Sequence, residues 1–367
     1  MAKVLAAVVL MAAVATGSPL LAQQPAQARA SAALAMLLQK DAEGFASASA
    51  PWRFRFPADH GAHPAYRSES WRFSGSVATR EGRRFGFQLT FLRVGINPPA
   101  TPVGPSAWAA KDVYWAQFAV SDAAGNRQYE FEQLTRAAME MSGAESSPVR
   151  VWVRDWVMEM RNADGRDAGF GLRASQDDAS IELSLHTAKP AVTRTAGDPR
   201  PHEPASTNRF HAYLVTRLTA KGIIRVGEHV WTVEGIAWLD RAWGEVPLPI
   251  GALVWDRFLL QLDDARDLMV LRLRRRDGSG EPLVTGLLVE RDGSARTLEA
   301  GRLALDAVDQ RWRLRMSEQR LELYLDPYVR MQEKSHSLQS WSAVHIRGTA
   351  EGQGYVELAA YAASGSR

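Results

Sequence analysis

The sequence predicts an all-β fold in two domains, and three observations lead to that prediction. Apolar and polar residues alternate strictly in 181–186 and 321–325, so each of these strands buries one face. Turn residues recur between such strands, and Gly supplies the positive φ of a hairpin in 162–165, 276–279 and 291–294. The chain has 367 residues, 46% of them hydrophobic, which is enough to bury two cores. Short strands separated by turns are typical of sandwiches and barrels.

Residues 1–28 have the pattern of a signal peptide. Lys3 precedes an apolar run over 4–14, and small residues at Ala22 and Ala28 offer cleavage sites. A membrane anchor is the alternative, but the run is shorter than the about 20 residues needed to span a bilayer. We therefore expect a mature protein that is periplasmic or secreted and is not an integral membrane protein.

The composition excludes several classes of protein. The chain has no cysteine, so its fold does not depend on disulfides, and thiolate metal sites and a lipid-modified cysteine are excluded. Lys and Arg number 44 against 41 Asp and Glu, which leaves a net charge of +3. Basic residues alternate with apolar ones in 311–316, as on the solvated face of a strand, so we expect no nucleic-acid partner.

Two breaks in the strand pattern divide the chain. Residues 29–50 are expected to form a short helix and a lead-in, because leucines follow one another there at helical spacing. The alternation stops again in 189–208, where four prolines stand among Thr, Gly and Asp. This predicts an N-terminal domain over 51–205 and a C-terminal domain over 206–367.

The usual catalytic signatures do not occur in the sequence. It has no G-x-S-x-G elbow, no phosphate-binding Gly-rich loop and no H-E-x-x-H, so a serine hydrolase or nucleotide enzyme is not expected. The nearest approach to a metal motif is the segment 59–63, which carries Asp59, His60 and His63. It lacks a third clear ligand, and loop histidines commonly bond backbone, so we expect no metal.

Tryptophan is abundant, and several of the 12 rings stand beside ionisable residues, in 69–71, 238–243 and 255–256. A carboxylate next to a large apolar ring can have its pKa raised enough to transfer protons at neutral pH. A buried Trp with a neighbouring surface charge is the alternative interpretation.

Five segments occur in an order that resembles one family, namely 56–63, 69–72, 86–93, 235–244 and 354–358. They are similar to D-H-G-x-H, E-W-W-Y, G-F-Q-L-T-F-F-R, W-M-D-H-E-W-G and G-Y-V-E-L-T-G-Y of the AttH-like and carotenoid 1,2-hydratase (hydroxyneurosporene synthase) family. The resemblance implies two packed lipocalin-like β-barrel domains, an apolar cavity and no cofactor. Members include hydratases of a terminal isoprenoid double bond and exported proteins found with ABC-type transport systems.

The resemblance also implies site residues. Asp240 and Glu69 are the expected catalytic residues, and the expected ligand-binding residues are Trp71, Gln88, Arg93, Trp238, Trp243 and Trp255. The sequence departs from the family where Arg241 and Ala242 replace His and Glu, and where Ser70 and Arg72 replace Trp and Tyr. If the Arg241 guanidinium approaches Asp240, it favours the ionised carboxylate and weakens that acid.

Three hypotheses about function follow. The first is an exported protein that binds an apolar, lipid-like or isoprenoid-like ligand and serves an ABC transport system. The second is a cofactor-free hydro-lyase or isomerase that acts on a prenyl or polyene substrate, with Asp240 as the acid and tryptophans stabilising a carbocation. The third is a purely structural role. The fold alone does not choose among them.

Overall fold

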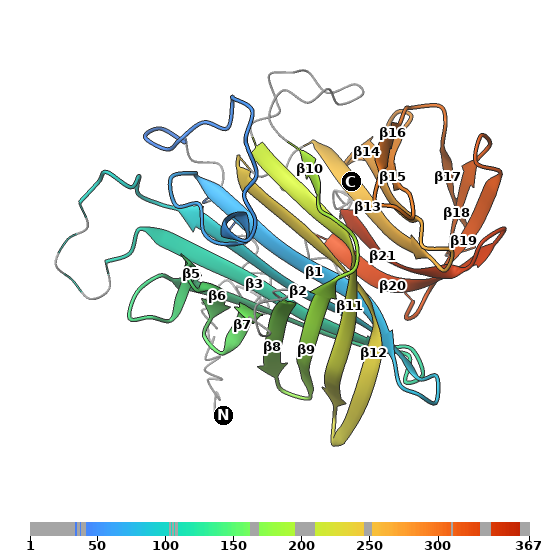
Figure 1. Cartoon of the computed structure of the whole chain (residues 1–367), viewed down its shortest axis with the longest axis horizontal. Coiled ribbons are helices and arrows are strands. Elements are labelled where there is room, and N and C mark those ends of the chain that lie inside the picture. Colours follow the sequence, from blue (N-terminus) through green and yellow to red (C-terminus); the bar gives the residue numbers. More distant parts are fainter. Residues whose placement is uncertain are drawn as a thin grey trace, which may run out of the picture.

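The computed structural model describes Leu34, Leu37, 42–102, 104, 106, 109–161, 169–194, 210–245, 252–309, 311–330 and 339–359. In these ranges the fold is almost entirely β, with one 3-10 helix, η1 (Ala58–His60), and two sheets (Figure 1). The predicted all-β class is confirmed. The expected signal peptide lies outside the described residues, as does most of the expected helix, of which Leu34 and Leu37 are helical.

The first sheet curls into a nearly closed barrel, with strand order β4-β3-β2-β1-β12-β11-β9-β8-β7-β6-β5 and β10 beside β11. Its strands are β1 (Ser68–Ala78), β2 (Arg84–Gly95), β3 (Asp112–Asp122), β4 (Arg127–Arg136), β5 (Ser142–Ser146), β6 (Val149–Val153), β7 (Trp156–Arg161), β8 (Gly169–Gln176), β9 (Ala179–Thr187), β10 (Val192–Arg194), β11 (Phe210–Val226) and β12 (His229–Gly244).

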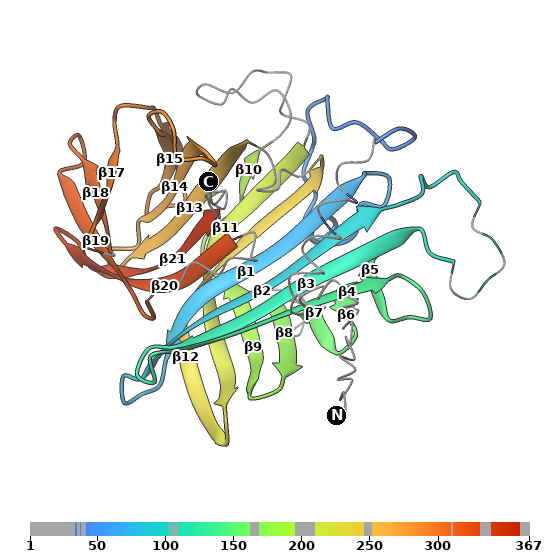
Figure 2. The ribbon, with the colours of Figure 1, turned by 180° about the vertical axis from the view of Figure 1, so that it is seen from behind.

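The second sheet is a curled half-barrel of order β16-β15-β14-β13-β21-β20-β19-β18-β17 (Figure 2). Its strands are β13 (Leu253–Leu262), β14 (Asp267–Arg275), β15 (Leu283–Val289), β16 (Ala295–Leu298), β17 (Ala304–Val308), β18 (Arg311–Met316), β19 (Leu321–Pro327), β20 (Gln339–Gly348) and β21 (Gly352–Ala359).

The change from one sheet to the other lies between Gly244 and Leu253, later than the predicted boundary at 205/206, which itself falls outside the described residues. The long strands β11 and β12 therefore belong to the first sheet, although the prediction placed them in the second domain. The reason is long-range pairing, since β12 pairs with β1 and β11 pairs with β9. The proline-rich segment thus precedes β11 and β12, which pair with strands of the first sheet.

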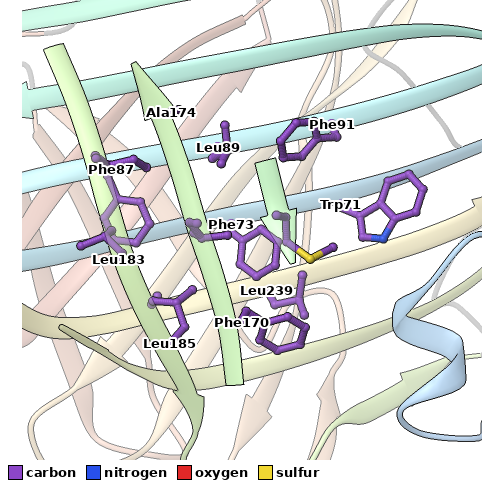
Figure 3. Close-up of a cluster of buried hydrophobic side chains, with 14 of the residues drawn as sticks. Trp71, Phe73, Phe87, Leu89, Phe91, Phe170, Ala174, Leu183, Leu185 and Leu239 are labelled. Atoms are coloured by element: carbon purple, nitrogen blue, oxygen red, sulfur yellow. The ribbon is translucent and has the colours of Figure 1, made fainter. Parts of the chain in front are cut away.

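Alternation along the strands builds the two cores. The apolar positions of 181–186 in β9 and of 321–325 in β19 are buried, as predicted. Gly278 and Gly293 have the positive φ expected of their turns, whereas 162–165 lies outside the described residues. Figure 3 shows part of the first core, where the labelled side chains are Trp71, Phe73, Phe87, Leu89, Phe91, Phe170, Ala174, Leu183, Leu185 and Leu239.

A third apolar cluster lies between the two sheets. The Tyr355 hydroxyl of β21 donates to the Gln88 side-chain oxygen of β2 at 2.6 Å, within this contact. Burial of the apolar side chains of this cluster joins the two sheets. The members of the cluster are Ala119, Trp238, Leu259, Met269, Trp341, Ala343 and Tyr355. No helix in the described part of the chain has both the length and the apolarity to cross a membrane.

Candidate functional site: a charged and aromatic cluster at one end of the first barrel

Antiparallel pairing brings distant residues together at one end of the first barrel. Glu69 on β1 stands opposite Arg93 of β2 and Trp243 of β12, and Trp71 stands opposite Arg241. The segment that contains η1 is bonded to this end of the barrel. We call this region the aromatic end and define it by Trp52, Phe54, Phe56, His60, His63, Trp71, Tyr213 and Trp243.

Hydrogen bonds to backbone carbonyls hold the η1 segment against the barrel. The Trp71 indole donates to the His60 carbonyl at 2.9 Å, and Arg241 donates to the Gly61 carbonyl at 2.6 Å. Arg93 donates to the Tyr66 carbonyl at 2.7 Å. Buried polar groups are thereby paired, so the loop has a defined position over the barrel end.

Glu69 is a fully buried carboxylate with three donors. Arg93 Nε donates to its Oε1 at 2.5 Å, Arg241 donates to Oε2 at 2.6 Å, and the His63 backbone N–H donates to Oε2 at 2.9 Å. Burial by itself would raise the pKa of Glu69, but Arg93, Arg241 and the His63 side chain hold that pKa well below its usual range. Glu69 is thus a permanent counter-ion rather than a proton donor.

Arg241 lies in the centre of this end. Its guanidinium carbon is 3.9 Å from the centroid of the Trp71 ring and 5.2 Å from that of Trp243, which is cation–π geometry. Burial lowers the pKa of Arg241, and Glu69 opposes that shift. Among the described residues, Arg241 Nε and the Trp243 indole N–H are buried without a hydrogen-bond partner. Other buried donors without a partner occur elsewhere in the described chain, for example the Trp231 and Trp238 indoles, and at the aromatic end the two donors lie beside an ion-paired cluster.

The two histidines of the segment 59–63 point in different directions. His63 stacks on Trp243 at 4.0 Å between ring centroids, and its Nε2 lies 3.2 Å from Asp59 Oδ1. His60 Nδ1 instead lies 2.5 Å from the Tyr213 hydroxyl. The two imidazoles therefore do not converge, and the described residues contain no group of three His, Cys, Asp or Glu that could hold a metal.

The His60 imidazole lies among aromatic rings. Its centroid is 4.9 Å from that of Phe56, 5.0 Å from Phe170 and 5.4 Å from Tyr213. Burial, helped by the nearby Arg241 charge, lowers the pKa of His60 to about 4, and burial raises the pKa of Tyr213. Both groups are neutral at pH 7. Tyr213 was not predicted as a site residue, because it occupies an alternating position of a strand and belongs to no motif.

Asp240 lies on the other face of β12. Adjacent residues of a strand point to opposite faces, so the Arg241 guanidinium pairs with Glu69. The approach of Arg241 to Asp240, which the sequence left open, does not occur. Asp240 accepts a hydrogen bond from Arg257 of β13, across the contact between the sheets. Arg257 also lies 3.4 Å from Glu357. The two expected catalytic acids are thus separated by the sheet, and both are ion-paired.

The expected ligand-binding residues divide in the same way. Three of them, Trp71, Arg93 and Trp243, lie at the aromatic end. Trp238 is buried between the sheets, where Gln88 bonds Tyr355. Trp255 is partly buried two positions before Arg257 on β13, so it shares the face of β13 that meets Asp240.

The family of this chain follows from a comparison with protein-family models. The model described as AttH-like matches residues 47–361, which is most of the sequence. The chain belongs to the AttH-like family. The family predicted from the five motifs is thereby confirmed.

Solved structures share the fold of this AttH-like protein. A protein from Nitrosomonas europaea with the provisional name AttH has a TM-score of 0.72 and 23% identity, over 87% of this chain and 100% of its own. Kievitone hydratase from Nectria haematococca has a TM-score of 0.57 and 11% identity, over 87% of this chain and 97% of its own. None of the curated proteins compared with this AttH-like chain matches it.

Proposed function

We propose that this AttH-like protein binds an apolar ligand of the lipid or isoprenoid type at the aromatic end. The observation that carries the proposal is Phe56, a large apolar ring that is 43% exposed and contacts the rings of Phe54 and Tyr213. Phe56 stacks on Phe54 with 6.3 Å between centroids, and Phe54 packs on Trp243 at 5.6 Å. An apolar ligand that covers Phe56 removes this surface from water and extends the aromatic packing.

The state of the two expected acids supports a binding function. Glu69 is held ionised by Arg93 and Arg241, and Asp240 is paired with Arg257. Protonating a carbon–carbon double bond requires a strong acid that still holds its proton. Glu69 does not meet that requirement, and Asp240 is bonded to Arg257 on the opposite face of β12. A binding protein requires no such acid.

A binding experiment with a matched control tests the proposal. Intrinsic tryptophan emission is titrated with a C15 isoprenoid alcohol, and we expect quenching because four tryptophan or tyrosine rings define the aromatic end. Phe56→Ala should weaken binding about 5-fold, since part of one Phe side chain is lost from the contact. Val230→Ala removes another exposed apolar side chain, 61% exposed on β12, and should leave binding unchanged. Equal weakening by both variants, or unchanged emission across a panel of lipids and polyenes, argues against the proposal.

The proposal includes export and service to an ABC-type transport system. Its support is the sequence pattern of residues 1–28, with Lys3 before an apolar run, together with the resemblance of the motifs to exported members of the family. Intact-mass analysis of the periplasmic fraction should give a chain that begins after Ala22 or Ala28. Retention of Met1 on protein confined to the cytoplasm contradicts export. Co-purification of ABC transporter subunits with the tagged mature protein tests the association.

The second candidate is a cofactor-free hydro-lyase or isomerase that acts on a prenyl or polyene substrate. One observation favours it, the neutral His60–Tyr213 pair beside the exposed Phe56 ring. The pair places two proton-carrying side chains beside a substrate that covers Phe56. Conversion of an acyclic carotenoid by the wild type, followed by product mass, tests this candidate. Turnover that is lost in Tyr213→Phe assigns the proton transfer to the His60–Tyr213 pair, and turnover that is lost in Asp240→Asn assigns it to Asp240.

A further inference from the structure

We infer that the ligand carries a hydroxyl or carbonyl oxygen, and that His60 donates a hydrogen bond to that oxygen from Nε2. The inference rests on the proposed ligand binding at the aromatic end and names the chemical class of the ligand. It concerns an apolar molecule with one neutral acceptor oxygen, as opposed to a pure hydrocarbon.

The first step concerns the proton of Tyr213. The Tyr213 side chain is fully buried, and a buried hydroxyl that does not donate is costly. Among the described residues, the hydrogen-bond partner of this hydroxyl is His60 Nδ1, at 2.5 Å. Tyr213 therefore donates its proton to Nδ1.

The second step fixes the tautomer of His60. A neutral imidazole has one N–H donor and one acceptor nitrogen. Because Nδ1 accepts from Tyr213, the proton of neutral His60 is on Nε2. The hydrogen bond of one ring nitrogen thus sets the role of the other.

The third step concerns what Nε2 meets. Within the described part of the chain, the hydrogen bond of the His60 ring is the one from Tyr213 to Nδ1. The ring is only partly buried and lies between Phe56 and Phe170, at 4.9 and 5.0 Å. An apolar ligand that covers Phe56 would remove Nε2–H from water, and the lost hydrogen bond must then come from the ligand.

The neutral state of His60 determines which kind of ligand oxygen its Nε2–H can bind. The fold disfavours a positive charge on this imidazole, through burial and the nearby Arg241. A neutral N–H matches a hydroxyl or carbonyl oxygen. A carboxylate would have to be desolvated without a facing cation, since Arg241 and Arg93 are already paired with Glu69.

Three C15 probes of one carbon skeleton test the inference. Farnesene has no oxygen, farnesol has a hydroxyl and farnesal has a carbonyl that only accepts. Tryptophan quenching should show farnesol and farnesal binding the wild type about 5-fold more tightly than farnesene. His60→Phe should abolish this preference, so that the three probes bind with equal affinity, and Tyr213→Phe should reduce it, because the tautomer is then no longer held. Val230→Ala, an exposed position of β12, should keep the preference of the wild type.

A measurement that needs no variant provides an independent check. The ¹⁵N chemical shifts of His60 in the wild type should report a protonated Nε2 and an unprotonated Nδ1 at pH 7. Equal affinity for all three probes, or a protonated Nδ1, overturns the inference and leaves apolar binding standing. Failure of all three probes to bind overturns the proposed function itself.

Discussion

Glu69 shows how burial and charge pairing compete at the scale of a single residue. Water is excluded from its carboxylate, which favours the protonated form, but two guanidinium groups at 2.5 and 2.6 Å favour the ionised form more strongly. The ionised state connects β1, β2 and β12. Removing the charge of Glu69 would leave Arg241 buried without its counter-ion, whereas Arg93 would keep its pair with Asp112 at 2.7 Å.

We expect Glu69→Gln to lower the free energy of unfolding by about 3–5 kcal/mol, because breaking a buried pair leaves an uncompensated charge. Urea denaturation at pH 7 measures this. Glu159→Gln removes the surface pair with Arg161, in which both side chains are more than one-third exposed, and should change stability by less than about 1 kcal/mol. Similar effects of the two substitutions contradict this account of Glu69.

His60 predicts a specific dependence of stability on pH. Its pKa is about 4 in the folded protein and 6.5 as the reference value, so the fold favours the neutral imidazole. That contribution is fully present above pH 6.5 and is lost as the pH falls through 4, and it amounts to at most about 3 kcal/mol. The stabilisation from Glu69 is present above its reference pKa of 4.5, so the window from 6.5 to 4.5 isolates the histidines.

The check compares wild type and His60→Phe by urea denaturation at pH 7.5, 5.5 and 4.5. His211, whose pKa is also lowered to about 4 by burial and by His63, stays present in both proteins. The wild type should lose more stability between pH 7.5 and 4.5 than the variant. Parallel pH profiles would show that His60 is not held neutral by the fold.

At the scale of the element, β12 connects two environments. Arg241 and Trp243 point into the aromatic end of the barrel, while Trp238 and Asp240 meet the second sheet. The period-two alternation of a strand makes this division unavoidable. Residues that form one motif in the sequence therefore serve two separate parts of the molecule.

Asp240→Asn should accordingly affect the contact between the sheets more than the ligand. We expect a loss of about 1–2 kcal/mol of stability, since the pair with Arg257 is only slightly exposed, and farnesol affinity within about 2-fold of the wild type. A double-mutant cycle with Arg257→Gln measures the coupling. A large loss of affinity in Asp240→Asn, with stability unchanged, would place the ligand between the sheets.

At the scale of the whole molecule, one buried carboxylate links the two sheets. Asp267 of β14 is 2.8 Å from Lys189 Nζ and 2.6 Å from Arg217, and it accepts from the Thr216 hydroxyl at 2.8 Å. Thr216 and Arg217 belong to β11 of the first sheet and Lys189 follows β9 by two residues, whereas Asp267 belongs to the second sheet. Together with the apolar cluster around Tyr355, they hold the sheets in one arrangement.

Asp267→Asn should weaken this link and separate the unfolding of the two sheets. Calorimetry of the wild type should show one transition, and the variant should show two, or one transition lowered by about 3 kcal/mol or more. Asp306→Asn breaks the exposed pair with Arg315 and should leave the profile unchanged. An unchanged profile for Asp267→Asn would mean that the remaining contacts, the apolar cluster and the Asp240–Arg257 pair among them, are enough to join the sheets.

The sequence by itself determined the features that depend on local pattern. Alternation in 181–186 and 321–325 predicted which residues are buried, and glycine predicted the turns at Gly278 and Gly293. Five ordered motifs predicted the family and, through it, the barrel fold. These features follow from the period of a strand and the conformational freedom of glycine, which neighbouring residues specify.

Only the tertiary structure determined which residues pair with one another. The sequence does not state that Arg241 pairs with Glu69, that Asp240 pairs with Arg257, or that His60 meets Tyr213, because the residues of each pair come from different strands or loops. Strand order also places β11 and β12 in the first sheet, although both strands follow the proline-rich segment. Pairing across a barrel is a property of register and sheet order, and alternation specifies a face of the strand without specifying what that face meets.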